Sequence, residues 1–170
     1  PGFGGHFTTK ALSGGGPLID LGVHRIDLAL WLMGHPQPEW VIGNTCAPIA
    51  TRLSKEMKKH FDVEDFAAGH VRFANGVTMN VEASWASNRA ENEFMETRLY
   101  GTQGGLVQRN LEETYKFEAE LFVEQNGCQY DMKLHPPIPS PKSSMYHFID
   151  CIVKNEPHIA TGEEGLIVQE

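Results

Sequence analysis

The chain has 170 residues, of which 41% are hydrophobic and 21% are charged, and its formal net charge is −8. This length suits about one domain, and the composition excludes disordered, collagen-like and disulfide-dense proteins. The acidic balance argues against nucleic-acid binding and against docking on anionic lipid. No apolar run approaches the ~20 residues that a membrane span needs.

The N-terminal part of the chain predicts a Gly-rich loop over residues 1–16 and a helix over residues 17–33. Pro17 stands at the start of the apolar stretch and Gly34 follows its end at Met33. Proline in the first turn and glycine just past the last turn are typical of a helix. Because the helix is apolar nearly all round, we expect it to be buried.

Residues 39–134 have the pattern of strands. Apolar residues alternate with polar ones from Val77 to Trp85, which is a period of two. Asn-Gly pairs at 75–76 and 126–127 lie between such runs and predict hairpins. The expected strands are 41–50, 71–73, 77–85, 94–100, 106–108, 117–123 and 130–134, with a short solvated helix or loop over 53–60.

The C-terminal part predicts a Pro- and Ser-rich linker over residues 135–143 and an amphipathic helix from Met145 to about Asn155. The apolar face of that helix is expected to comprise Phe148, Ile149, Ile152 and Val153. A last helix begins near Thr161. Strands bracketed by helices predict an α+β fold, a predominantly antiparallel β-sheet with helices packed on one face, as a single domain over residues 1–170.

Both ends of the sequence and its cysteines bear on the context of the chain. Pro1 to Gly5 has the character of the middle of a longer chain, and the sequence stops within a predicted helix, so we expect a domain truncated at both ends. Three widely separated cysteines without a C-x-x-C pair predict buried or half-buried free thiols. Free thiols, together with the lack of a signal peptide, favour a cytoplasmic location.

Three polar residues form a line on the first predicted helix. Asp20, His24 and Asp27 lie at i, i+4 and i+7, within about 60° of one another at roughly 100° per residue. A histidine oriented by a carboxylate one turn away can act as a general acid or base near neutral pH. Two other interpretations remain open: a hydrogen-bonded Asp–His pair that only packs the helix, and a metal site built from the histidine and two aspartates.

The residues around this line resemble a known family. The run from Ser13 to Asp27, S-G-G-G-P-L-I-D-L-G-V-H-R-I-D, resembles the start of the C-terminal domain of the Gfo/Idh/MocA oxidoreductases, the glucose-fructose oxidoreductase and inositol dehydrogenase family. Residues 96–105, E-T-R-L-Y-G-T-Q-G-G, and the C-terminal run T-G-E-E-G at 161–165 agree with it. The resemblance covers nearly the whole chain.

The resemblance implies a dehydrogenase that uses NAD or NADP and acts on a secondary hydroxyl or ketone of a sugar or cyclitol. It implies that His24 is the catalytic acid/base and that Asp20 orients it, with Asp27 near the substrate. The N-terminal dinucleotide-binding domain of the family and its catalytic lysine are absent from this sequence. The cofactor-binding residues are therefore unknown, and we expect this chain alone to bind no nicotinamide tightly and to be inactive.

Other residues are weaker candidates for substrate contacts. Lys10 lies close to the line, Trp85 can pack against a sugar through its aromatic face, and His147 precedes the apolar face of the later helix. The family also implies a homodimer or homotetramer formed through the open face of the sheet. Two alternatives remain: a non-catalytic sugar-binding or dimerisation module that retains the fold, and a metal-dependent hydrolase that uses the Asp–His–Asp line.

Overall fold

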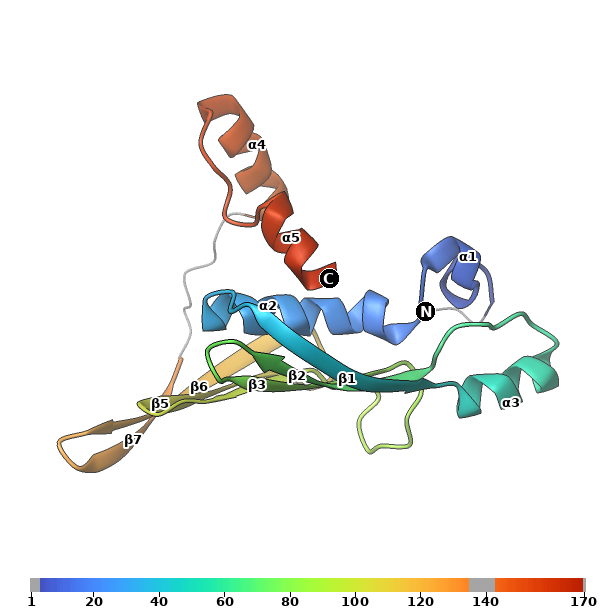
Figure 1. Cartoon of the computed structure of the whole chain (residues 1–170), viewed down its shortest axis with the longest axis horizontal. Coiled ribbons are helices and arrows are strands. Elements are labelled where there is room, and N and C mark those ends of the chain that lie inside the picture. The colour runs from blue at the N-terminus through green and yellow to red at the C-terminus, as the bar shows by residue number, and fades with distance from the viewer. Residues whose placement is uncertain (1–3, 135–142, 170) are drawn as a thin grey trace. The chain divides into compact units, whose positions relative to one another are not determined.

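The structure is a computed structural model that describes residues 4–134 and 143–169. The chain divides into two compact units, Pro1–Ala90 and Glu91–Glu170, and each is described by itself. Figure 1 shows the course of the chain and the labels of its elements. In the described ranges, no helix is both long enough and apolar enough to cross a membrane.

The first unit is built on a three-stranded antiparallel sheet in the order β1-β2-β3. Its elements are η1 (His6–Thr8), α1 (Lys10–Ser13), the π-helical segment η2 (Leu18–Gly22), α2 (Val23–Met33), β1 (Pro38–Cys46), α3 (Pro48–Met57), β2 (Phe66–Phe73) and β3 (Thr78–Ser84). The helical run formed by η2 and α2 lies along one side of this sheet (Figure 1).

The core of the first unit lies on the sheet face that meets this helical run. Ala67 and Ala83 are register partners on neighbouring strands, and Phe73 follows on the same face because side chains alternate along a strand. All three are buried, as is Leu30 of α2. The opposite face of the sheet carries Trp40, Ile42, His70, Arg72 and Asn80 and has no helix of the first unit on it (Figure 1).

The second unit contains a four-stranded antiparallel sheet in the order β4-β5-β6-β7. Its elements are β4 (Glu96–Tyr100), β5 (Gly104–Leu111), β6 (Lys116–Gln125), β7 (Cys128–Lys133), α4 (Ser144–Lys154) and α5 (Gly162–Gln169). The hairpin between β6 and β7 has a two-residue loop in which Asn126 and Gly127 both have positive φ, 54° and 74°. Such a loop matches the twist of the flanking strands, so the predicted hairpin is confirmed.

The predicted α+β fold with antiparallel strands is confirmed, although the strands form two separate sheets. The strand expected over 41–50 ends at Cys46, because Pro48 starts α3, and this helix covers Pro48–Met57 rather than 53–60. Ser143 caps the N-terminus of α4, since its side chain accepts a hydrogen bond from the Tyr146 N–H. The linker expected at 135–143 falls almost wholly outside the described residues.

The structure corrects three expectations about burial. The first helix is not buried all round, since Ile19 and Leu21 are 44% and 42% exposed. The apolar face expected on α4 is also open, with Phe148, Ile149, Ile152 and Val153 all more than half exposed. The cysteines are free as expected, but Cys46 and Cys128 are exposed and only Cys151 is buried. The periodicity of a helix locates its apolar face, but it does not identify what covers that face.

Candidate functional site

The site begins at a π-helical turn. Pro17 precedes the turn. The Val23 N–H donates to the carbonyl of Leu18, five residues earlier, whereas in an α-helix it would donate to the carbonyl four residues earlier. Gly22 lies against β3, because a Cβ there would be 3.3 Å from the Ala83 Cβ and 2.9 Å from Leu18 Cδ1. Single π-helical turns are frequent at functional sites. The wider turn also moves Asp20 and His24 off the regular angular spacing that the sequence implied.

Asp20 is held by Trp85, the residue that directly follows β3. The Trp85 indole Nε1–H donates to Asp20 Oδ2 at 2.9 Å, which joins two predicted site residues that are 65 positions apart. Trp85 itself is fixed by its backbone N–H, which donates to the Asp65 carbonyl at 3.1 Å. Its ring also meets the Phe61 ring edge-on, with 6.3 Å between centroids. Asp20 therefore has a defined position at the start of the helical run.

His24 and Asp27 lie further along the helical run and are exposed, whereas Asp20 is only half-buried. In the described part of the chain, His24 makes no hydrogen bond or ion pair, and its ring is open to a ligand. Asp20 bonds Trp85 rather than His24. The neighbouring Arg25 is half-buried, and this burial lowers the pKa of its guanidinium.

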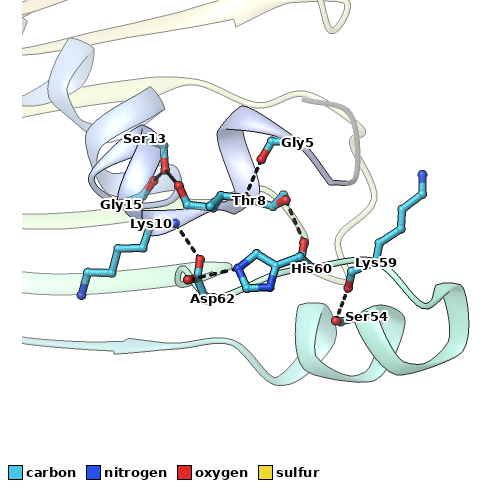
Figure 2. A network of polar contacts seen from close by, with 10 residues as sticks. Gly5, Thr8, Lys10, Ser13, Gly15, Ser54, Lys59, His60 and Asp62 are labelled. Atoms are coloured by element: carbon cyan, nitrogen blue, oxygen red, sulfur yellow. Dashed lines mark hydrogen bonds and ion pairs between the residues drawn. The ribbon is translucent and has the colours of Figure 1, made fainter.

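Lys10 lies in the same unit, at the first residue of α1. Its backbone N–H donates to Asp62 Oδ1 at 2.6 Å, and this bond is the largest cause of a lowered pKa for Asp62. Asp62 also pairs with His60 at 3.1 Å, and the Thr8 hydroxyl donates to the His60 carbonyl. Figure 2 shows that the Lys10 side chain extends away from Asp62. The charged end of Lys10 is thus not used by this network.

His147 lies in α4 of the second unit, where its ring makes local contacts. His147 Nε2 accepts a hydrogen bond from the Ile159 N–H at 3.2 Å and lies 3.6 Å from Cys151 Sγ. These contacts tie the segment after α4 back to the helix. The ring therefore has a structural task in this unit.

The three glycines before the helical run, Gly14 to Gly16, allow another segment to approach the backbone closely. The approach at Gly16 is made by the chain itself, since a Cβ there would lie 2.1 Å from the Glu64 carbonyl oxygen. The Glu64 carboxylate also accepts a hydrogen bond from the Leu18 N–H at 3.3 Å.

The sequence analysis missed the acidic residues Asp62, Glu64 and Asp65. Their run, D-V-E-D, is a signal in the sequence, but such a run usually marks only a solvated surface.

The described residues contain no group of three or more histidine, cysteine, aspartate or glutamate side chains that is placed to hold a metal ion. Asp20, His24 and Asp27 therefore do not gather as a three-ligand cluster in this structure. What the site offers is a fixed carboxylate, an open imidazole and a bordering tryptophan. Such a set can bind a hydroxyl group and exchange its proton.

Comparison with known proteins relates this geometry to a family. The D-glucoside 3-dehydrogenase of Escherichia coli K12 is 30% identical over 177 residues, an alignment that covers all of this chain and 48% of that protein. Levoglucosan dehydrogenase in complex with NADH has the same fold, with a TM-score of 0.73 at 21% identity, over 96% of this chain and 48% of that one.

A protein of Desulfitobacterium hafniense that is described as an NADPH-dependent oxidoreductase is also similar in fold. Its TM-score is 0.72 at 19% identity, over 97% of this chain and 46% of that one. The chain thus spans about half the length of the relatives it matches. The model of the GFO/IDH/MocA C-terminal domain matches residues 2–107, and the chain belongs to this family.

Proposed function

We propose that this chain is the substrate-binding and acid/base half of an NAD(P)-dependent oxidoreductase that acts on a secondary hydroxyl or ketone of a sugar or cyclitol. The observation that carries the proposal is the Trp85–Asp20 hydrogen bond, which fixes a carboxylate at the start of a helical run whose exposed face carries His24. Relatives that are named sugar dehydrogenases support the substrate class, among them levoglucosan dehydrogenase, solved with NADH and L-sorbose.

The described residues do not fit a dinucleotide site by themselves. Every strand pair in them is antiparallel, whereas a dinucleotide fold is built from parallel βαβ units. We therefore place NAD or NADP in a part of the protein outside this chain. When bound there, the cofactor supplies the hydride acceptor or donor.

In this proposal the residues of this chain handle the proton. His24 accepts the proton of the substrate hydroxyl as the carbinol carbon is oxidised, and it returns that proton to the oxygen in the reverse direction. Asp20, held by Trp85, limits the orientations open to the imidazole and to the substrate. Asp27 and the Trp85 ring border the substrate, and Lys10 of the same unit is a further candidate for contact.

The test is His24→Ala in the complete protein, assayed with sugars and cyclitols and both nicotinamide cofactors. We expect kcat to fall by roughly 10²- to 10⁴-fold, because one general acid/base typically contributes that much. His6→Ala is the matched control, since His6 is an exposed histidine of the same unit that lies in η1 and packs edge-on against Phe7. An unchanged rate in His24→Ala would favour the alternative, a sugar-binding module without catalysis.

The open face of the β1–β3 sheet supports a further proposal about assembly, a homodimer or homotetramer formed through that face. Trp40 and Ile42 are 49% and 67% exposed there, beside His70. Apolar side chains gathered on one sheet face are typical of an interaction surface. Light scattering on the complete protein tests this, and a monomer at micromolar concentration would refute it.

A further inference from the structure

A stretch of four residues in the loop before β2, Asp62 to Asp65, binds the starts of three helical segments. Asp62 Oδ1 accepts the Lys10 N–H at the first residue of α1, at 2.6 Å. Glu64 Oε1 accepts the Leu18 N–H at the first residue of η2, and Asp65 Oδ2 accepts the Ala50 N–H in the first turn of α3, at 2.6 Å. The first N–H groups of a helix have no partner inside it, so a carboxylate stabilises each of these starts.

Glu64 contacts the helical run that carries Asp20. Pro17 has no N–H, so the Leu18 N–H is the first donor of that run. Glu64 reaches it because the glycines leave room: a Cβ on Gly15 would lie 3.8 Å from both Glu64 carboxylate oxygens, and one on Gly16 would lie 2.9 Å from its carboxylate carbon. Glu64 is thus packed against the segment that leads into the turn, and Asp20 lies two residues after the bonded N–H.

The same stretch also holds Asp20 from its other side. The Asp65 carbonyl accepts the Trp85 N–H at 3.1 Å, and it also accepts the Ser84 hydroxyl at 2.9 Å. Trp85 in turn donates its indole N–H to Asp20. Two adjacent residues, Glu64 and Asp65, therefore fix the beginning of the π-helical turn and the tryptophan that bonds its carboxylate.

We propose that Glu64 is a positioning residue: by bonding the Leu18 N–H and packing on the glycines it sets where the π-helical turn begins, and so the direction of Asp20 and His24. This inference rests on the proposed function, since it assumes that Asp20 and His24 act on the substrate. Glu64 reaches the reaction only through the helix start.

The first test is Glu64→Ala in the complete protein. We expect kcat to fall by about 10- to 100-fold with a smaller change in KM, because small displacements of reacting groups cost rates of this order. Glu64→Gln should restore kcat to within about threefold, since its amide oxygen can accept the same N–H. Glu39→Ala is the matched control, a carboxylate of the same unit whose partner is the distant Arg72. It should leave kcat unchanged.

A merely stabilising role predicts a different result. In that case Glu64→Ala lowers the melting temperature but leaves kcat per folded molecule, and its pH profile, as in the wild type. If the alanine variant fails to fold, Glu64→Asp is tested in its place. Aspartate keeps the charge, but its side chain is one methylene shorter, so the carboxylate lies further from the Leu18 N–H. A reduced kcat in the folded aspartate variant supports positioning, and a wild-type kcat in it overturns the proposal.

The pairing with His24→Ala separates this proposal from the proposed function. If both hold, Glu64→Ala lowers the rate much less when His24 is already absent, because the two residues act in one unit. If His24→Ala lowers the rate and Glu64→Ala does not, positioning by Glu64 is refuted and the proposed function stands. If His24→Ala leaves the rate intact, the proposed function fails, and the inference about Glu64 fails with it.

Discussion

The two sheets of this protein are stabilised in different ways. In the described residues, the fully buried apolar side chains belong to the first unit, apart from Cys151. In the second unit, one face of the sheet carries three ion pairs, Arg98–Glu96, Arg109–Glu118 and Lys133–Glu120. The register places these pairs on one face and Leu106, Leu121 and Met132 on the other.

The two units differ in how closely their segments must pack. The π-helical turn and Asp20 depend on a close backbone contact at Gly16, where a Cβ would lie 2.1 Å from the Glu64 carbonyl oxygen, and on the approach of Gly22 to the Ala83 side chain. In each ion pair of the second unit the arginine or lysine side chain is about half exposed, and ion pairs that solvent reaches stabilise weakly. The first unit is therefore expected to be sensitive to small changes of volume, and the second unit tolerant of them.

The largest expected effect is that of Gly16→Ala. Its new Cβ would meet the Glu64 carbonyl oxygen at 2.1 Å, and a backbone atom has little freedom to move away. We expect a loss of about 3 kcal/mol, the upper part of the usual range for overpacking. Gly165→Ala in α5 is the control, since nothing lies within 4 Å of a Cβ there, and it should stabilise by up to about 1 kcal/mol. Urea unfolding of the complete protein measures the change in the free energy of unfolding for each variant. Equal changes would contradict the expected difference between the two units.

A smaller loss is expected from Asp65→Ala. The Asp65 side chain is 1% exposed and accepts the Ala50 N–H, so its removal leaves a buried donor at the start of α3 without its cap. Loss of such a cap costs about 1–2 kcal/mol. Glu120→Ala removes a carboxylate of the second unit that pairs with Lys133. If Glu120→Ala proved the more destabilising of the two, the contrast between the units would be wrong.

The smallest effect concerns pH. Lys133 lowers the pKa of Glu120, and Glu120 raises the pKa of Lys133. Glu120 therefore adds to the free energy of unfolding at pH values above its ordinary pKa. This stabilisation is lost as the pH falls through the lowered pKa of the folded protein. Lys133 adds to the free energy of unfolding at pH values below its ordinary pKa. This stabilisation is lost as the pH rises through the raised pKa of Lys133 in the folded protein. The free energy of unfolding, measured against pH, should differ slightly between the wild type and Glu120→Gln in the range between these two pKa values. The two curves should converge in acid. A difference that persists in strong acid or grows with salt would refute this account.

The sequence predicted the parts of the fold that local patterns determine. The β6–β7 hairpin follows from Asn126 and Gly127, which tolerate positive φ, and the α2 region follows from Pro17 and Gly34. The start of α3 was missed because the apolar run of β1 continues past Cys46, although Pro48 is a good first helical residue.

The candidate site was predictable only in part. The line of Asp20 and His24 was apparent in the sequence, and the sequence also pointed to Trp85 as a neighbour of the substrate. The bond between Asp20 and Trp85 was not predictable, because it joins residues 65 positions apart through the packing of β3. The π-helical turn and the contact of Glu64 also depend on how Gly16 and Gly22 meet other segments, which no helical or strand period encodes.

The acidic stretch from Asp62 to Asp65 has a consequence for how the protein can change in length. It lies outside helices and strands, and surface loops usually accept inserted residues at little cost. Here one added residue would shift carboxylates that serve three helix starts at once. Insertions that vary substrate preference during evolution or engineering are therefore expected elsewhere, for example in the exposed residues 87–92.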